Sequence, residues 1–285
     1  SVPFKGNPLA VVFDADSLDD TQMQSIARWT NLSETTFIVA PTDPRADYRV
    51  RIFTPGGELP FAGHPTLGTA HAMLESGYQP KMAGRLVQQC GVGLVELAAQ
   101  RDGGWAFSAP PARIAPLPLS QYDALSAALA SDAIDFTAAP TAVNNGAPWL
   151  VVRMQSADAC LALAPNAAAL ADLVHRAGAR GLAAYGPHEP HSADAPATFE
   201  VRCLMAGRGF GTGEDPVTGS ANAAIAGLLT LQQRRPGTHY TARQGTALGR
   251  DGRIRVTYDD VAGHTWIGGE SVTVIDGTCR LRVDV

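Results

Sequence analysis

The sequence predicts an α+β protein built from two similar domains, and three observations support this prediction. The stretch 54–70 returns at 205–221 without a gap, so that His64 corresponds to Asp215. Each copy has an alternating strand, at 48–53 in the first and 199–205 in the second, and a glycine-containing loop, followed by a proline and a helix-forming run. The chain is long enough for two domains of about 140 residues each.

The helix-forming run of each copy begins at a proline, Pro65 in the first and Pro216 in the second. Proline is favoured in the first turn of a helix because its missing N–H would have no partner there. We therefore expect His64 and Asp215 at or next to the N-caps of two helices, where backbone N–H groups are free and the helix dipole is positive. Small residues such as Gly219 leave these first turns open, so two facing helix starts would bind a carboxylate.

The first domain is predicted to alternate short strands with two helices. A strand at 9–13 belongs to a second repeat, in which the stretch 6–12 returns at 146–152. The chain starts on loop-like residues, so a short strand is expected to precede Ser1. Asp19 and Asp20 start a helix that ends at Asn31 and whose buried stripe comprises Met23, Ile26, Ala27 and Trp29. The other elements are a strand at 32–39 with Glu34 at its entrance, a helix at 65–76, and a hairpin of strands 84–97 and 104–108.

The prolines at 110, 111, 116 and 118 mark a linker between the two domains. The first domain is therefore expected to span 1–116 and the second 117–270, with 271–285 a candidate for crossing back to the first. The second domain is predicted to contain helices at 121–131 and 166–177 and strands at 149–152, 182–185, 254–258 and 265–267, with further strands at 271–285.

Composition and charge exclude several classes of function. A net charge of −5, with 22 Lys and Arg residues spread along the chain, gives no basic surface for nucleic acid or an acidic membrane. No apolar run approaches the roughly 18 residues of a membrane span. The four cysteines lie far apart, which predicts free thiols in a cytoplasmic protein. His188 and His191 share a proline-containing loop without a third ligand, so no metal is expected.

The glycine-rich stretch 207–213 does not fit the common nucleotide-binding motifs. No register of it satisfies G-x-G-x-x-G, and there is no Walker A lysine. Gly219 and Ser220 lack the G-x-S-x-G elbow of acyl-enzyme serines. Two classes remain: an enzyme that acts on a small carboxylate, or a binding protein that uses the same helix starts without chemistry.

Four motifs resemble a known family, the PhzF-like proteins of phenazine biosynthesis, which are relatives of diaminopimelate epimerase. The motifs are GNPLAVVFDADSL from residue 6, NLSETTF from residue 31, FAGHPTLGTA from residue 61 and GEDPVTGSA from residue 213. The resemblance covers nearly the whole chain. It implies a diaminopimelate epimerase-like α+β fold of two similar domains. In that fold each domain is a barrel-like sheet around a central helix, and the active site lies between the two domains on a pseudo-twofold axis.

The resemblance also implies which residues form the site. Glu34 is similar to the general acid/base of the family, and His64 and Asp215 are similar to its other catalytic groups. The residues that we expect to bind substrate are Ser220, Gly219, Thr218, Gly63 and Asn7. The related racemases and epimerases carry a cysteine at each helix start, whereas neither stretch contains one here. A two-thiol epimerase is therefore not expected.

The resulting hypothesis is a PhzF-like isomerase that shifts a proton on a small carboxylated substrate without a cofactor. Glu34 would take a proton from carbon and return it elsewhere, with its pKa raised by burial toward the working pH. The helix ends should keep His64 neutral and Asp215 ionised. The alternatives are a non-catalytic carboxylate-binding protein, or an epimerase or dehydratase on the same fold. The family resemblance also implies a homodimer.

Overall fold

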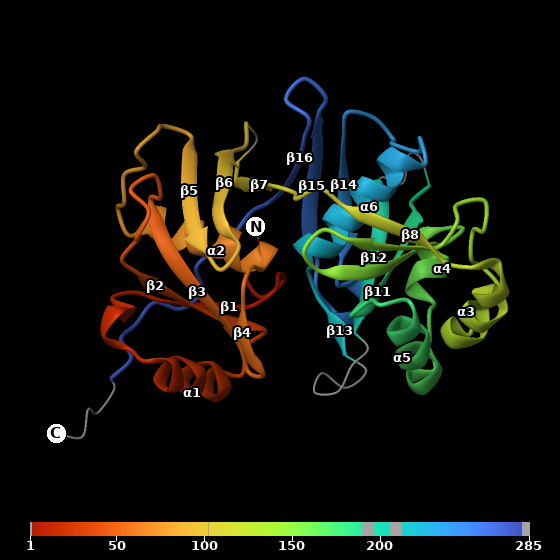
Figure 1. The fold of residues 1–285 in the computed structure, drawn as a ribbon, viewed down its shortest axis with the longest axis horizontal. Coiled ribbons are helices and arrows are strands. Elements are labelled where there is room, and N and C mark those ends of the chain that lie inside the picture. The colour runs from red at the N-terminus through yellow and green to blue at the C-terminus, as the bar shows by residue number, and fades with distance from the viewer. Residues whose placement is uncertain (1, 102, 190–196, 206–212, 281–285) are drawn as a thin grey trace.

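The computed structural model describes residues 2–101, 103–189, 197–205 and 213–280 (Figure 1). The first half of the chain contains β1 (Leu9–Val12), α1 (Asp20–Thr30), β2 (Glu34–Val39), β3 (Tyr48–Thr54), β4 (Gly57–Leu59), α2 (Gly63–Glu75), β5 (Arg85–Cys90), β6 (Gly93–Ala99) and β7 (Trp105–Ser108). The second half contains β8 (Arg113–Pro116), α3 (Tyr122–Leu129), β9 (Thr141–Asn144), β10 (Pro148–Arg153), α4 (Ala157–Leu161), α5 (Ala167–Arg176), β11 (Gly181–Pro187), β12 (Phe199–Met205), β13 (Glu214–Asp215), α6 (Gly219–Leu231), β14 (His239–Gln244), β15 (Gly252–Asp259) and β16 (His264–Gly269). Short 3-10 helices lie at Ala15–Ser17, Leu119–Gln121 and Thr246–Leu248.

The two halves of the sheet share one topology, which confirms the predicted α+β fold of two similar halves. In the first half β1 is parallel to β2, β2 is antiparallel to β3, β3 is parallel to β5, and β6 and β7 follow antiparallel. The strands β10, β11, β12, β14, β15 and β16 repeat these pairings in the second half. Because β7 pairs antiparallel with β16, the halves join in one continuous sheet.

One helix fills the centre of each half (Figure 1). α2 packs on β1, β2 and β7, and α6 packs on β9, β10, β11, β15 and β16. The sequence of α6 is Gly-Ser-Ala-Asn-Ala-Ala-Ile-Ala-Gly-Leu-Leu-Thr-Leu, small and aliphatic on every side. A helix without a polar face is stable only where a core surrounds it, so the sheet of the second half wraps around α6.

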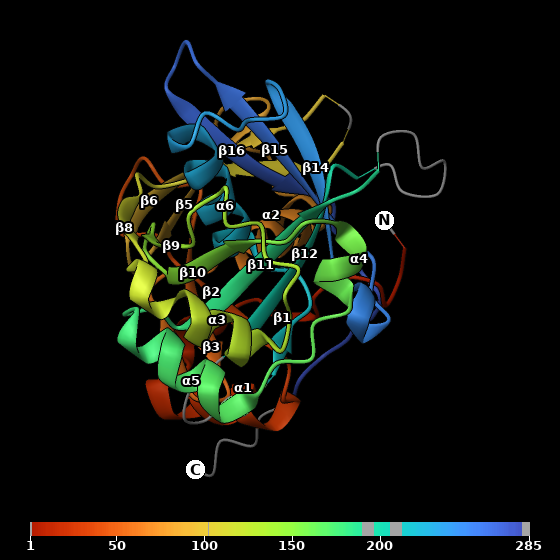
Figure 2. The same ribbon diagram turned by 90° about the vertical axis from the view of Figure 1, so that its right-hand side faces the viewer.

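The outer helices are amphipathic and cover the lower face of the molecule (Figure 2). α1 starts with a reciprocal capping box between Asp19 and Gln22, and it buries Met23 and Ala27. The expected stripe is wrong at Trp29, which is 86% exposed, because residue 29 lies off the helical face that carries 23 and 27. Among the described residues, no helix is long and apolar enough to cross a membrane.

Two strand predictions are wrong in detail. The predicted strand 84–97 is a hairpin of β5 and β6, because the chain turns at residues 91–92 and Gly93 follows at a φ of 99°, where glycine is favoured. Residues 271–280 form no strand, although strands were predicted there. This segment runs across the first half, where the Thr273 hydroxyl lies 3.0 Å from Nε2 of His71 on α2. Residues 281–285 lie outside the described residues. The strand β8 pairs with β9 of the second half, and the domain limits stay a prediction.

The internal repeat holds, but its register changes along the chain. β3 and β12 correspond as the sequence predicts, with Ile52 aligned on Cys203. Ile52 pairs with Leu59 in the first ladder, and Cys203 pairs with Asp215 in the second. Asp215 therefore corresponds to Leu59, and the predicted match between His64 and Asp215 is wrong. The reason is that the connection from β12 to β13 is longer than the connection from β3 to β4, so the start of α6 at Gly219 corresponds to the start of α2 at Gly63.

The two ladders carry the same ion pair, which supports the corrected alignment. In the first half the Arg51 guanidinium donates to both oxygens of Glu58, at 2.8 and 2.7 Å. In the second half Arg202 donates to both oxygens of Glu214, at 3.2 Å and 2.8 Å for the shortest bond to each. Glu58 and Glu214 directly precede the two corresponding positions.

Candidate active site

Two helix starts meet at the centre of the molecule. A Cβ atom on Gly63 would lie 3.2 Å from the Cα of Gly219 and 2.9 Å from Cζ of Phe107, so the first residues of α2 and α6 touch only because both are glycine. The residues before them, Ala62 and Thr218, provide no side-chain cap. In α1, α4 and α5, by contrast, a side chain caps the first turn. The first-turn N–H groups of the two central helices are therefore available to an anion.

Replacing Gly63 by alanine is expected to destabilise the protein by about 1–3 kcal/mol, because the new methyl group would overlap the buried Phe107 ring. Gly227→Ala is the matched control, since a Cβ there would meet nothing closer than 3.5 Å and alanine favours the helix. Chemical denaturation of both variants measures the effect. Equal stability of the two variants would show that the helix starts are not tightly packed.

Glu34 and His64 face each other beside these helix starts. Glu34 is the first residue of β2, and His64 is the second residue of α2. Oε2 of Glu34 lies 3.1 Å from Nε2 of His64, and the two side chains are only 15% and 16% exposed. Both atoms are buried, and neither makes a hydrogen bond of good geometry with any described residue. Two buried polar atoms left without partners are costly, so their position here calls for a reason in the chemistry of the site.

Asn7 connects His64 with Asp215. Its Nδ2 donates to Oδ1 of Asp215 at 2.7 Å and to the carbonyl oxygen of Val217 at 3.0 Å, and it lies 3.3 Å from Nδ1 of His64. The two protons of this amide are taken by Asp215 and Val217, so Asn7 lies in contact with the ring of His64 and does not assign its tautomer.

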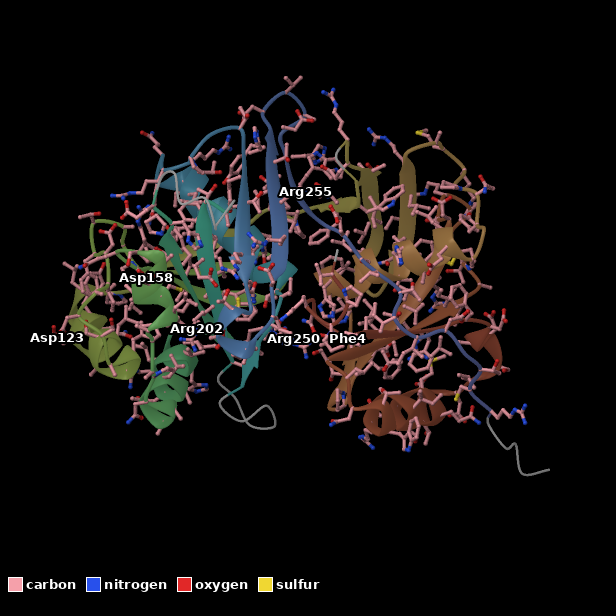
Figure 3. The ribbon with its side chains drawn as sticks, turned by 180° about the vertical axis from the view of Figure 1, so that it is seen from behind. Phe4, Asp123, Asp158, Arg202, Arg250 and Arg255 are labelled. Atoms are coloured by element: carbon pink, nitrogen blue, oxygen red, sulfur yellow. The ribbon has the colours of Figure 1, made fainter. Side chains whose placement is uncertain are left out.

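The N-terminal segment that carries Asn7 is fixed to the second half of the molecule. Figure 3 labels Phe4 and Arg250 side by side, and Nη1 of Arg250 donates to the carbonyl oxygen of Phe4 at 2.8 Å. The Lys5 ammonium donates to the carbonyl oxygen of Gly249 at 3.0 Å, and the carbonyl oxygen of Lys5 accepts from the N–H of Asp251 at 2.9 Å. These bonds hold Asn7 between the two halves, where it reaches both His64 and Asp215.

Asp215 is held by a buried polar network. The Thr218 hydroxyl donates to Oδ2 of Asp215 at 2.7 Å and accepts from Nε2 of Gln244 at 2.9 Å. Oε1 of Gln244 accepts from the N–H of Thr218 and from Nδ2 of Asn222, both at 3.0 Å. Thr218, expected to bind substrate, therefore has its hydroxyl turned toward Asp215. Asp215 itself lies in β13, before the N-cap residue Thr218 of α6 and not at the helix start.

Burial sets the protonation of the three polar groups. It raises the pKa of Glu34 to about 8; the charge of Asp215 raises it further, and that of Arg180 lowers it. Burial lowers the pKa of His64 to about 3, so this side chain is neutral as expected, but burial and not the helix end is the largest cause. Burial also raises the pKa of Asp215, against the hydrogen bonds from Thr218 and Asn7. This direction is opposite to the expectation that the helix end would hold Asp215 ionised.

Ser220 and Trp149 lie on the other side of the helix contact. The indole Nε1 of Trp149 donates to Oγ of Ser220 at 3.1 Å, which leaves the Ser220 hydroxyl proton for another acceptor. The ring of Trp149 lies under the Arg180 guanidinium. Sequence reasoning missed Trp149, Arg180 and Gln244. The sequence did contain a signal for Trp149, because the repeat of 6–12 at 146–152 aligns Trp149 with Leu9. This alignment alone did not indicate that Trp149 contacts Ser220.

Comparisons with known proteins show the family of this chain. The family model described as phenazine biosynthesis-like protein matches residues 1–277. The chain belongs to this family. It is 35% identical to antisense-enhancing sequence 1 of Schizosaccharomyces pombe, covering 96% of this chain and 93% of the relative. It is also 35% identical to the trans-2,3-dihydro-3-hydroxyanthranilate isomerase of Pseudomonas aeruginosa, covering 89% and 85%.

A solved structure confirms the fold of this phenazine biosynthesis-like protein. The PhzF-family protein of Bacillus anthracis superimposes with a TM-score of 0.78 at 24% identity, covering 94% of this chain and 90% of that one. Together with the family match and the relatives that are named isomerases, this likeness identifies the chain as a PhzF-family isomerase with the diaminopimelate epimerase-like fold. Among the described residues, no group of three or more His, Cys, Asp or Glu side chains could hold a metal ion. His188 instead contacts Glu200 at 3.2 Å, and His191 lies outside the described residues.

Proposed function

We propose that this isomerase shifts a proton on a small carboxylated substrate by general acid/base catalysis at Glu34, without a cofactor. The supporting observation is the pair of facing atoms, Oε2 of Glu34 and Nε2 of His64, buried without good hydrogen bonds beside two uncapped helix starts. In this proposal the first-turn N–H groups of α2 and α6 hold the substrate carboxylate. The negative charge that develops after proton removal then lies near these donors.

Glu34 acts as a base in its ionised form and returns the proton to a second carbon as an acid. A pKa of about 8 suits both steps near neutral pH, because neither form is strongly favoured. His64 stays neutral, with its Nε2 next to the Glu34 carboxyl group. Asp215 orients an amine or hydroxyl group of the substrate with the lone pairs left by its bonds to Asn7 and Thr218.

The single carboxylate is favoured over a two-thiol epimerase. No cysteine lies in the first turn of α2 or α6. Burial raises the pKa of the Cys160 and Cys203 thiols, which disfavours the thiolate that such chemistry needs. In the repeat, Leu9 of the first half corresponds to Trp149 of the second. Leu9 pairs with Glu34 in one ladder and Trp149 pairs with Gly181 in the other, so Gly181 is the position that corresponds to Glu34. Among the described residues, Glu34 therefore has no acid/base partner at the corresponding position of the second half.

Deuterium labelling separates this enzyme from a carboxylate-binding protein. The wild type is incubated in deuterated water with small unsaturated carboxylates, including trans-2,3-dihydro-3-hydroxyanthranilate, the compound in the name of the P. aeruginosa relative. We expect conversion of one of them with deuterium on a carbon atom, because the proton that Glu34 takes from the first carbon exchanges with solvent before Glu34 returns a proton to the second carbon. Saturable binding without conversion or labelling would identify a binding protein and reject the proposal. The expected homodimer and cytoplasmic location stay predictions.

A further inference from the structure

Arg180 is a pre-organised cation at the edge of the candidate site. Its guanidinium carbon lies 5.7 Å from the centre of the Trp149 ring, over the ring face. Its backbone N–H donates to the carbonyl oxygen of Pro148 at 2.9 Å. Among the described residues its guanidinium has no hydrogen-bond or ion-pair partner. The guanidinium thus lies over an aromatic ring, and no described residue takes its N–H donors.

Trp149 fixes the position of Arg180 relative to the start of α6. The Trp149 side chain is 1% exposed, and its Nε1 donates to Oγ of Ser220, the second residue of α6. A Cβ atom on Gly181 would lie 2.7 Å from Cζ3 of Trp149, so the ring fills the space where the second half has no counterpart of Glu34. The indole therefore links Arg180 to the start of α6, since its ring lies under the guanidinium and its Nε1 donates to Ser220.

The charge of Arg180 is felt within the site. It lowers the pKa of Glu34 and also that of Asp215, although it forms an ion pair with neither carboxylate. A cation that lies near two buried carboxylates, pairs with neither and donates to no other described residue is suited to an anionic group brought by the substrate.

We propose, on the basis of the proposed function, that Arg180 binds a second anionic group of the substrate. The first carboxylate occupies the first-turn N–H groups of α2 and α6, and the second forms two parallel N–H···O bonds with the guanidinium across the Trp149 ring. The preferred substrates are thus small, flat molecules with a carboxylate at each end. This assignment makes Arg180 a residue that determines specificity, and it leaves the proton shift to Glu34.

Calorimetric titration with two matched probes tests this assignment. Benzoate carries one carboxylate on a ring, and isophthalate carries two. We expect the wild type to bind isophthalate about tenfold more tightly than benzoate, because a charge-assisted pair is gained. Arg180→Gln should remove this preference, weakening isophthalate about tenfold and benzoate less than about twofold. Arg85→Gln removes an exposed arginine that pairs with Glu96, and as the control it should change neither affinity.

Arg180→Lys keeps the charge but lacks the planar pair of donors, so it should retain a preference of about threefold. Circular dichroism and thermal melting check that both variants fold. If Arg180→Gln does not fold, the Arg180→Lys variant replaces it in the test. An equal loss of both probes in Arg180→Gln would overturn the assignment. A wild type that binds benzoate without preferring isophthalate would overturn it and leave the proposed function in place, whereas a wild type that binds neither probe would count against both.

Discussion

Glu34→Gln is expected to lower turnover by about 10²–10⁴-fold while the protein remains folded. Glutamine keeps the size and the hydrogen-bonding shape of the side chain but can neither take nor return a proton. The environment predicts little loss of stability, because Glu34 is buried with its pKa raised and an uncharged side chain suits that site. Turnover with the substrate found by deuterium labelling measures the effect, and circular dichroism checks the fold.

Glu58→Gln is the control for this variant. It makes the same chemical change in the same half of the molecule, at a side chain that is 41% exposed and paired with Arg51. Turnover of Glu58→Gln should stay within about twofold of the wild type, since exposed ion pairs contribute little. Wild-type turnover in Glu34→Gln would remove Glu34 from the mechanism. A similar loss in both variants would point to a general loss of structure.

The rate constant kcat/KM is expected to rise about 50-fold between pH 6 and pH 8. A carboxyl group with a pKa of about 8 is about 1% ionised at pH 6 and about half ionised at pH 8, and only the ionised form is a base. Because kcat/KM reports the ionisations of the free enzyme, the pKa that Glu34 has before substrate binds sets the expected midpoint. A profile that is flat from pH 6 to pH 8 would mean that Glu34 is not the titrating base.

Substitutions of the neighbouring charges should move this profile in opposite directions. Asp215→Asn removes the negative charge that raises the pKa of Glu34, so the midpoint should fall to lower pH. Arg180→Gln removes the positive charge that lowers this pKa, so the midpoint should rise. The profiles of both variants are measured beside that of Arg85→Gln, whose midpoint should match the wild type. A shift of both charge variants in one direction would exclude Glu34 as the titrating group.

The duplicated fold carries an asymmetric site, and the corrected repeat explains how. The first half supplies Glu34 and His64, whose counterparts in the second half are Gly181 and Ser220. The second half supplies Asp215, whose counterpart in the first half is Leu59. The two halves thus share a scaffold and divide the chemistry, with the N-terminal segment that ends in Asn7 bridging them.

The sequence by itself determined the elements and the main polar groups. Alternation and turn residues predicted β3 and β12 closely, and the repeat predicted two equivalent halves. The family motifs pointed to Glu34, His64 and Asp215, which the structure brings together through Asn7. The strands and the motifs could be predicted because each depends on residue type and spacing within a short stretch of sequence.

Only the tertiary structure decided the alignment of the halves and the electrostatics of the site. The connection from β12 to β13 is longer than its counterpart in the first half, so Gly63 corresponds to Gly219 and not to Glu214. A comparison of the two sequence stretches without gaps cannot detect this insertion. Arg180 and Trp149 enter the site through packing between β10, β11 and α6, elements far apart in the sequence. The pKa shifts of Glu34 and His64 come mainly from burial, and burial depends on which distant segments cover a side chain and not on its neighbours in the chain.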